Sequence, residues 1–393
     1  MSKDLSVSRK SINPLLICLS NSWGGLEQVA ADDAAELSRL EVRVKIFVLE
    51  GSPIHQNLTE FQGEYLEIIP LSYRPRDFLD FQFKRDLLAQ VARGVNVIHA
   101  HQPTLIGSIS PWLWRSNSVS FFLSRHILSN HGKKDPIHAL LYSRVDRLVV
   151  MSEAMKENVL RTHPLADEKV ELIRLGLDFD TFDPEKVDSK KQRAAWGADE
   201  DTIVIGLVGR IDPAKGQSTL IQAGAGLIQK IGDRVKIKFV IVGEETLGQT
   251  SNYLNELKHM VAQFQMEDSV VFAGFQKNIP EVMQAFDLFV MPSKQEAFGL
   301  VAIEAMAMEC PIIISSGGSS LEIVGKEEFG LLMRPQDAFD LQRQLQILIE
   351  KESLRREMGV KARKQVMSLY DRRERTKKTL ALYERGFLRR STY

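Results

Sequence analysis

Cysteine is scarce in this sequence, with only Cys18 and Cys310 among 393 residues. Both lie in apolar stretches, so we expect buried free thiols, no disulfide framework, and a reducing compartment such as the cytoplasm. Long hydrophobic runs are also missing, and no stretch approaches the length that spans a bilayer. The first 13 residues are polar and lack an apolar core, which predicts a tail or leader rather than a secretion signal.

The chain has no net charge, because 51 Lys and Arg balance 51 Asp and Glu. This balance argues against bulk binding to nucleic acid, so we expect no nucleic-acid partner. The charge is uneven, since residues 351–393 carry 14 Lys and Arg against 5 Asp and Glu. Two interpretations stay open for this segment: a pair of solvated helices, or a surface that attracts an anionic acceptor or the cytoplasmic face of a membrane.

The length of the chain fits two domains of ordinary size, and 44% hydrophobic with 26% charged residues is typical of a globular protein. Apolar strands alternate with amphipathic helices throughout, which predicts an α/β fold with two parallel sheets covered by helices on both faces. The polar stretch 177–199 is the best linker. We therefore place one domain at 1–187, a second at 188–365, and a terminal segment at 366–393.

The predicted strands are 15–20, 42–49, 66–70, 95–99, 119–123, 147–151, 170–173, 203–208, 235–242, 270–272, 288–291, 311–314 and 330–332. The predicted helices are 26–40, 77–93, 153–161, 217–231, 252–265, 279–286, 299–308 and 338–350. The helix at 77–93 mixes aromatic and basic residues, so it is either a crossover helix packed on its sheet or a membrane-surface helix.

Two carboxylates, Glu296 and Glu304, mark the most unusual segment of the chain. Glu304 lies inside an apolar run from Leu300 to Met308 whose composition predicts a buried helix. A buried carboxylate needs a hydrogen-bonding or charged partner, which either the protein or a ligand supplies. The loop Phe298-Gly299 precedes this helix, and a helix start offers free N–H groups and a positive dipole end to an anion such as a phosphate.

A second candidate element begins with the apolar run Ile203 to Val208, which indicates a buried parallel strand. The run ends in Gly209-Arg210 and continues through a short loop to Lys215. Open α/β sheets bind ligands at the carboxyl ends of their strands, so we expect Arg210 and Lys215 where a diphosphate is held. The arginine fork and the lysine ammonium both suit phosphate oxygens.

These segments resemble the C-terminal domain of the GT-B retaining glycosyltransferases, and most closely those of family 4 (glycosyl transferases group 1). The resemblance covers nearly the whole chain, and it is specific because several weak motifs follow the family's order and spacing. The further motifs are the glycine loop at Ser22–Glu27, the strand end Ile98–His101, the helix opening at Val150–Glu153, and Gly317-Gly318 followed by Glu322.

The resemblance implies GT-B architecture, in which two Rossmann-like, doubly wound parallel-sheet domains face each other across a cleft. The first would be the acceptor side, the second would bind the nucleotide sugar, and the last helix would cross back to the first. The implied donor is a nucleotide-diphosphate sugar, with UDP-sugar expected first, and no separate cofactor is implied. Departure of the diphosphate builds negative charge, which Arg210 and Lys215 can stabilise without a metal. The pair Asp178 and Asp180 has metal-like spacing but lies at the linker, so we expect no metal ion.

The resemblance also assigns individual contacts to the donor. Glu304 would accept hydrogen bonds from the ribose, and Glu296 would hold hydroxyls of the donor sugar; an exposed loop acid is the alternative for Glu296. The remaining donor-binding set consists of Gly209, Ala297, Phe298, Gly299, Leu300 and Val301, whose backbones would face the sugar or the diphosphate.

Gly24 and Gly25 lie between a predicted strand and a predicted helix. Glycine lets a backbone approach a ligand closely, and a tight turn is the alternative explanation. In the family this loop meets the diphosphate or the acceptor when the cleft closes.

Three histidines follow two neighbouring strands. His99 and His101 share a strand face at its carboxyl end, and no cysteine or acid nearby in sequence completes a metal site. His126 follows the next strand, where the family often has a histidine near the donor sugar and the acceptor. We therefore place His126 in the catalytic set and His101 as a supporting residue; partly buried structural histidines are the alternative.

Together these features predict a retaining glycosyltransferase acting on an envelope glycan, a lipopolysaccharide or a lipid-linked saccharide. Retention and the acceptor class come from the resemblance alone. The predicted location is the cytoplasm, with peripheral association with the inner membrane through basic surface as an extension. The alternatives are a GT-B sugar epimerase or phosphorylase, which needs no second sugar acceptor, and a protein that binds nucleotide sugars without catalysis.

Overall fold

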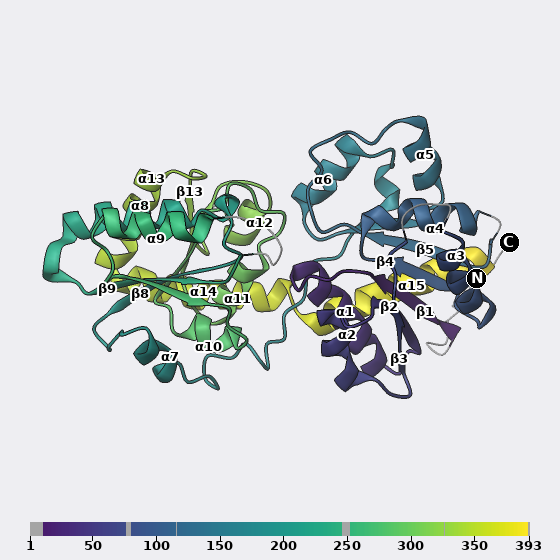
Figure 1. The fold of residues 1–393 in the computed structure, drawn as a ribbon, viewed down its shortest axis with the longest axis horizontal. Coiled ribbons are helices and arrows are strands. Elements are labelled where there is room, and N and C mark those ends of the chain that lie inside the picture. The colour runs from purple at the N-terminus through teal and green to yellow at the C-terminus, as the bar shows by residue number, and fades with distance from the viewer. Residues whose placement is uncertain (1–10, 76–79, 115, 246–251, 326, 392–393) are drawn as a thin grey trace, which may run out of the picture. The chain divides into compact units, whose positions relative to one another are not determined.

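The computed structural model describes residues 11–75, 80–114, 116–245, 252–325 and 327–391, and of residues 233 and 391 it describes only the backbone. Contacts divide the chain into two compact units (Figure 1). Unit 1 comprises residues 1–176 and 372–393, and unit 2 comprises residues 177–371. The boundary predicted after residue 187 therefore lies further along the chain than this division, and the terminal segment joins unit 1 from residue 372 rather than from 366.

Unit 1 is built on a parallel sheet of seven strands in the order β3-β2-β1-β4-β5-β6-β7. The order reverses between β1 and β4, so the loops after these two strands diverge at the point where open α/β sheets bind ligands. The strands are β1 (Pro14–Cys18), β2 (Val44–Leu49), β3 (Leu66–Leu71), β4 (Val97–Ala100), β5 (Ser120–Ser124), β6 (Arg147–Val150) and β7 (Val170–Leu172).

Helices cover the sheet of unit 1 because each connection between parallel strands needs a crossover. Helix α1 packs with α2 and α15, whereas α4 packs with α3 and α5. The predicted helix 77–93 corresponds to α3, which buries Phe83 and Leu87 as a crossover helix does; its first residues, 77–79, lie outside the described ranges. The helices are α1 (Gly25–Arg39), α2 (Pro53–Leu58), α3 (Phe81–Ala92), α4 (Ile106–Leu113), α5 (Pro136–Ser143), α6 (Glu153–Thr162) and α15 (Arg372–Ser391).

Helix α15 belongs to unit 1 although it ends the chain. Leu380, Leu382 and Tyr383 are buried in the same apolar cluster as residues of β1, β2 and β5. A Cβ on Gly386 would lie 2.6 Å from the ring of Phe122, so the helix approaches β5 with no room for a side chain there. The last helix is therefore part of the core of the first sheet.

Unit 2 repeats the same plan with six parallel strands in the order β10-β9-β8-β11-β12-β13. Its switch point lies between β8 and β11. The strands are β8 (Ile203–Val208), β9 (Ile237–Val242), β10 (Val270–Gly274), β11 (Leu288–Met291), β12 (Ile312–Ser315) and β13 (Leu331–Met333). The prediction of two Rossmann-like parallel-sheet domains is confirmed.

The helices of unit 2 lie on both sides of this sheet. Figure 1 shows α8, α9 and α13 on one side and α7 and α10 on the other. The helices are α7 (Lys190–Ala195), α8 (Gln217–Ile231), α9 (Tyr253–Gln263), α10 (Ile279–Gln284), α11 (Leu300–Ala307), α12 (Ser320–Val324), α13 (Ala338–Glu350) and α14 (Glu352–Leu369).

Two further expectations concern the whole chain. Cys18 and Cys310 are buried free thiols, as predicted, and burial raises the pKa of each thiol well above its usual range. Within the described ranges, no helix combines the length and apolarity that crossing a bilayer requires.

Candidate active site

The loop after β8 is shaped so that Lys215 faces the loop after β11. The carboxylate of Asp212 accepts a hydrogen bond from the backbone N–H of Ala214 at 2.8 Å and so starts a short helical turn that ends at Lys215. Gly216 follows with φ of 77°, and a Cβ there would lie 2.4 Å from the carbonyl oxygen of Pro292. Only glycine allows this approach, which presses the turn against the segment after β11.

The structure brings Lys215 and Glu296 into direct contact. The ammonium of Lys215 donates a hydrogen bond of 2.9 Å to Oε2 of Glu296. Both side chains are partly buried, with 29% of Lys215 and 19% of Glu296 exposed, so this charge-assisted bond is better protected than a surface ion pair. The cation predicted for the diphosphate and the acid predicted for the sugar therefore belong to one site.

A small hollow adjoins this pair. Its free space is about 10 Å³, which is roughly the room for one water molecule. The hydroxyl of Ser293 is buried beside it and has no hydrogen-bond partner among the described residues. Neither Arg210 nor Glu304 lines this hollow. The lining residues are Leu207, Val208, Lys215, Met291, Ser293, Glu296 and Val301.

The loop that carries Glu296 is held in place by a second glycine-rich loop. Gly318 has φ of 57°, and a Cβ there would lie 1.9 Å from the carbonyl oxygen of Glu296. The hydroxyl of Ser319 donates to the carbonyl of Phe298 at 2.5 Å. The Gly317-Gly318 motif therefore supports the backbone of the 296–299 segment. The family resemblance had pointed to this motif without giving it a role.

Helix α11 begins at the site with Gly299 as its N-cap. Gly299 has φ of 86°, which favours glycine, and its carbonyl accepts hydrogen bonds from the N–H groups of Ala302 and Ile303. The two preceding amides, of Leu300 and Val301, are therefore the ones at the helix start that can face an anion.

Glu304 lies one turn further along α11 than Leu300 and Val301, so it shares their face of the helix. Only 9% of Glu304 is exposed, as the sequence predicted for a carboxylate in an apolar helix. In the same segment, Phe298 is buried and its ring meets that of Tyr370 edge-on at 5.8 Å, whereas the preceding Ala297 is half-buried.

Gly209 and Arg210 directly follow β8, as predicted. The backbone of Gly209 is closely packed, whereas the side chain of Arg210 is exposed. The N–H of Gly209 donates to the carbonyl of Val242 at 2.9 Å, and a Cβ on Gly243 would lie 2.0 Å from the carbonyl oxygen of Gly209. Gly243 is therefore required by close backbone packing, which sequence reasoning had not recognised. The side chain of Arg210 is exposed, and its carbonyl accepts a 2.7 Å hydrogen bond from Gln217.

In unit 1, Gly24 and Gly25 stand at the start of α1, directly after the loop that follows β1. Neither glycine has a left-handed backbone, and Gly24, the N-cap, is extended with φ of −157°. A Cβ on Gly25 would meet no atom within 4 Å. A tight turn therefore does not explain these glycines, whereas the open space beside a helix start suits the close approach of a ligand.

The histidines divide into one structural residue and two with unused nitrogens. His99 is fully buried, with Nδ1 hydrogen-bonded to the hydroxyl of Tyr383 at 2.6 Å and Nε2 to the hydroxyl of Ser124 at 2.8 Å. His101 is also buried, lies between His99 and His126, and uses neither ring nitrogen in a hydrogen bond within the described residues. The stacked His126 likewise has no partner for Nε2 there.

Burial keeps these imidazoles neutral. Burial, then the charge of Arg375, lowers the pKa of His126 to about 3, and burial lowers the pKa of His99 to about 4. The pKa of His101 also lies well below its usual range, first because of burial and then because of its two histidine neighbours. At neutral pH each of these rings can donate one hydrogen bond and accept one, but it carries no charge.

The structure corrects the statement that no acid lies near His99 and His101. Asp33, on α1, lies 3.8 Å from His101, and one possible ligand atom of each of these three residues lies within 4.8 Å of the others. However, both oxygens of Asp33 accept hydrogen bonds from the buried guanidinium of Arg375. Both nitrogens of His99 are engaged as well, so these groups are arranged as a structural network rather than as free metal ligands.

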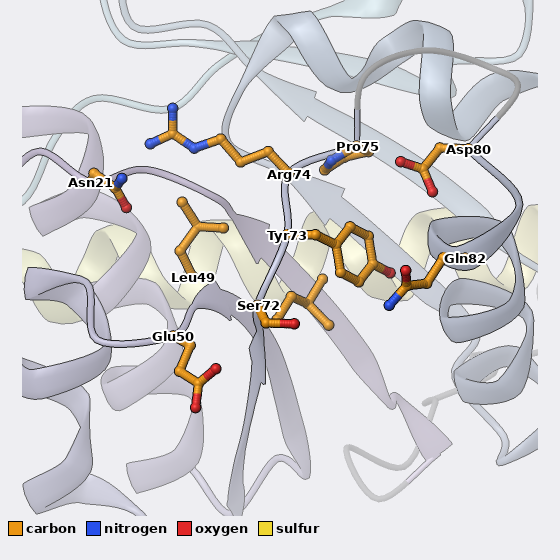
Figure 2. Close-up of a pocket in the computed structure, with 10 residues that line it drawn as sticks. Asn21, Leu49, Glu50, Ser72, Tyr73, Arg74, Pro75, Asp80 and Gln82 are labelled. Carbon is orange, nitrogen blue, oxygen red and sulfur yellow. The ribbon is translucent and has the colours of Figure 1, made fainter.

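A larger hollow, which the sequence did not predict, lies in unit 1 (Figure 2). It encloses about 730 Å³ at the carboxyl ends of β1, β2 and β3, a size typical of sites for small ligands. Tyr73 is fixed there by a 2.6 Å hydrogen bond from its hydroxyl to Asp86, and Figure 2 shows the guanidinium of Arg74 on the side of Asn21. The lining residues are Asn21, Leu49, Glu50, Leu71, Ser72, Tyr73, Arg74, Pro75, Asp80 and Gln82.

Each of the two units contains a stretch that matches a known protein family. Residues 188–365 match the family described as glycosyl transferases group 1, and residues 23–181 match glycosyltransferase family 4. The chain is 23% identical over 329 residues to mannosylfructose-phosphate synthase of Agrobacterium fabrum, covering 79% of this chain and 70% of that protein. It is 26% identical over 369 residues to D-inositol 3-phosphate glycosyltransferase of Corynebacterium aurimucosum, covering 86% of each.

Solved structures show the same fold. A glycosyltransferase from Rickettsia africae superposes with a TM-score of 0.84 at 18% identity, over 95% of this chain and 98% of that one. HepE of Anabaena, solved with UDP and glucose, superposes with a TM-score of 0.79 at 20% identity, over 94% of this chain and 99% of that one. The predicted GT-B fold class is confirmed by this likeness.

Proposed function

This chain belongs to the glycosyltransferases of family 4, group 1, and from that premise we propose that it transfers a sugar from a nucleotide-diphosphate sugar to a saccharide acceptor, retaining the anomeric configuration. The observation that carries the proposal is the contact between Lys215 and Glu296 at the carboxyl ends of β8 and β11. These two strands flank the switch point of unit 2, where an open α/β sheet binds its ligand.

The proposed donor is a UDP-sugar, held by unit 2 without a metal ion. The amides of Leu300 and Val301 at the start of α11 would bind diphosphate oxygens, and Glu304 on the same helix face would accept hydrogen bonds from the ribose. The Anabaena neighbour solved with UDP and glucose supports the choice of base. Gly209, Ala297, Phe298 and Gly299 would complete this donor set through their backbones.

The chemistry assigned to Lys215 and Arg210 is stabilisation of the departing diphosphate. Negative charge grows on the diphosphate as the bond to the sugar breaks, and cations fixed beside it lower the barrier. Glu296 would bind hydroxyls of the donor sugar while its contact with Lys215 keeps the ammonium in place. Retention without a dedicated nucleophile implies a front-face reaction, in which the leaving phosphate helps to accept the proton of the acceptor.

The acceptor is proposed to bind in unit 1. The hollow of about 730 Å³ could hold a small saccharide, and its lining of hydroxyl, amide, carboxylate and guanidinium groups suits sugar hydroxyls. Gly24, Gly25, His101 and His126 lie at the carboxyl ends of neighbouring strands of the same sheet. We assign His126 to contact with the reacting sugar and His101 to its support, since both keep unused ring nitrogens.

The acceptor class remains an envelope glycan, a lipopolysaccharide or a lipid-linked saccharide. The names of both curated relatives include a phosphorylated sugar or polyol, which favours a small phosphorylated acceptor as the second candidate. The cytoplasm is the proposed location, on the grounds of the two buried free thiols and a nucleotide-sugar donor.

Association with the membrane face would depend on exposed basic residues, such as Lys364 and Lys378. Several arginines of the basic C-terminal segment are already paired within unit 1, including Arg375 with Asp33 and Arg390 with Asp146. This pairing favours the interpretation of the segment as ordinary helices over that of a dedicated anionic surface.

Two measurements test the proposal. A thermal-shift panel of nucleotide diphosphates and their sugars identifies the donor, and a nucleotide at 100 times its Kd should add ~2.7 kcal/mol of stability. NMR of the product then gives the anomeric configuration, and an inverted linkage would reject retention. Conversion of the donor without transfer to a second sugar would instead indicate an epimerase or phosphorylase, and binding without turnover would indicate a nucleotide-sugar-binding protein.

A further inference from the structure

Arg125 is a buried arginine in an unusual setting. It directly follows β5, its backbone N–H donates to the carbonyl of Val149 at 2.9 Å, and only 4% of the residue is exposed. A buried guanidinium normally has a carboxylate partner, because an uncompensated charge away from water costs free energy. Two other arginines of unit 1, Arg144 and Arg375, are as deeply buried, and they pair with Asp146 and Asp33.

The partner of Arg125 is a neutral imidazole instead. Its Nη1 lies 3.3 Å from Nε2 of His163, and Nδ1 of His163 lies 2.8 Å from the hydroxyl of Thr162. That hydroxyl gives its own proton to the carbonyl of Asn158 at 2.6 Å, so it must accept from Nδ1–H of His163. His163 therefore presents a bare Nε2 to Arg125, and it satisfies one N–H without supplying a negative charge.

No carboxylate within the described ranges forms an ion pair with Arg125. The acid closest to it along the loop, Asp135, caps the start of α5 and pairs with His138. Tyr142, whose ring lies 5.2 Å from that of His163, has a buried hydroxyl with no hydrogen-bond partner among the described residues, and burial raises its pKa to about 12. The positive charge of Arg125 is thus left without a counter-charge of its own.

A second cation lies nearby, since the backbone N–H of Lys133 donates to the carbonyl of Thr162 at 2.6 Å, next to His163. Lys133, in the loop between β5 and α5, is half-buried, and burial followed by the charge of Arg125 lowers its pKa. The charges of Arg125 and Lys133 also act on His163, whose pKa burial lowers to about 4. Within the described part of the chain, Lys133 has no acidic partner either. Two like charges that are partly removed from water repel each other unless an anion lies between them.

We propose that Arg125 and Lys133 form an oxyanion subsite that binds a phosphate group carried by the acceptor. The guanidinium fork and the compact ammonium are the pair of donors that suits phosphate oxygens. Nη1 of Arg125 contacts His163, whereas Nη2 has no hydrogen-bond partner among the described residues. Nε of Arg125 and the hydroxyl of Tyr142 are buried and have no hydrogen-bond partner among the described residues.

The position of this subsite connects it with the reaction. Arg125 immediately precedes His126 at the carboxyl end of β5, the edge of the sheet that also carries His101 and the glycine loop. The inference rests on the proposed function in so far as the phosphate belongs to an acceptor. The subsite would favour sugar phosphates or phosphate-linked lipids as acceptors over neutral saccharides.

The test uses the whole protein with the donor site filled by saturating UDP, so that added phosphate cannot bind beside Lys215. Inorganic phosphate and glucose 6-phosphate are titrated by calorimetry into the unmodified protein, into Lys133→Gln and into the matched control Lys134→Gln. Lys134 is the exposed neighbour of Lys133 and loses the same charge when replaced. We expect Lys133→Gln to weaken phosphate binding about tenfold, as for loss of one charge-assisted contact, and Lys134→Gln to leave it within about twofold.

Arg125→Lys provides a second variant that keeps the charge but loses the fork, and it should weaken phosphate binding while UDP binding stays unchanged.

A parallel experiment measures whether the protein sediments with phosphatidylcholine vesicles that contain or lack phosphatidic acid. Binding of soluble phosphate assigns the group to a sugar phosphate, whereas binding only to vesicles with phosphatidic acid, lost in Lys133→Gln, assigns it to a lipid. Equal phosphate affinities for Lys133→Gln and the unmodified protein, or no phosphate binding in either arm while UDP binds, would overturn the subsite. Absence of nucleotide binding would instead count against the proposed function.

Discussion

The ammonium of Lys215 hydrogen-bonds the carboxylate of Glu296 at 2.9 Å across 81 positions of sequence, and so joins the loops after β8 and β11. We predict that Lys215→Ala lowers kcat by about 100-fold or more, as does loss of a donor to a charge that develops in the transition state. The Kd for the nucleotide should rise by less than about tenfold, because Leu300, Val301 and Glu304 still bind it. Steady-state kinetics and calorimetry with the identified nucleotide measure the two effects. Equal losses in turnover and binding would remove the assignment of Lys215 to charge stabilisation.

The two adjacent glycines of the 317–318 loop provide a matched pair of substitutions. Gly318→Ala would place a Cβ 1.9 Å from the carbonyl of Glu296 on a left-handed backbone, so we expect a shifted 296–299 segment, reduced activity, and a stability loss of about 1 kcal/mol or more. Gly317→Ala would meet no atom within 4 Å and should retain activity. Activity assays and thermal denaturation of both variants check this, and similar activities would show that the backbone contact does not position Glu296.

The buried pair of Asp33 and Arg375 should contribute strongly to the stability of unit 1. Arg375→Met leaves a buried carboxylate without its partner, which costs about 3–5 kcal/mol. Replacing both residues, as Asp33→Asn with Arg375→Met, should recover most of that loss, because no buried charge remains. Calorimetric unfolding measures each variant against Lys378→Met, an exposed position on the same helix. If the single and double variants are equally unstable, the loss comes from packing rather than from the stranded charge.

The buried histidines predict a loss of stability in mild acid. The pKa of His99 is lowered to about 4 in the folded protein, whereas an unfolded chain takes up this proton near about 6.5. Between these values the unfolded state holds more protons, so the stabilising contribution is present above about pH 6.5 and is lost as the pH falls toward 4. Denaturant unfolding at pH 7, 6 and 5 should show this decline in the free energy of unfolding. His99→Gln should make the decline with pH less steep, by an amount that corresponds to the uptake of up to about one proton. His131→Gln, at an exposed loop position, serves as the control and should keep the original slope.

Most strands of both sheets could be predicted because they are short apolar runs, and the central ones, such as β1, β5 and β11, are buried along their whole length. The runs 203–208 and 288–291 coincide with β8 and β11, and the other predicted strands overlap observed ones. Helices α4 and α5 were not predicted, since Pro111 lies inside α4, and α5 begins at Pro136 and spans only eight residues. Proline and short length are turn signals, and packing against neighbouring helices overrode them here.

The site was predictable where a residue follows its own strand and unpredictable where it depends on a distant partner. The positions of Gly209, Lys215 and the histidines after their strands could be predicted from the apolar runs that precede them, and their roles stay predictions. The partner of His99, Tyr383, lies 284 positions away, and no local pattern announces a contact at that range. Asp33 was overlooked for the same reason, since the arginine that explains its burial lies 342 positions later.

The return of α15 to the first sheet has a consequence for biosynthesis. Unit 2 is one continuous segment, so all of its residues are synthesised before those of α15. Unit 1 lacks the residues that seal its apolar cluster, including Leu380 and Tyr383, until the final helix emerges. A chain truncated after residue 371 would therefore contain every residue of unit 2 but would lack the helix that completes the apolar core of unit 1.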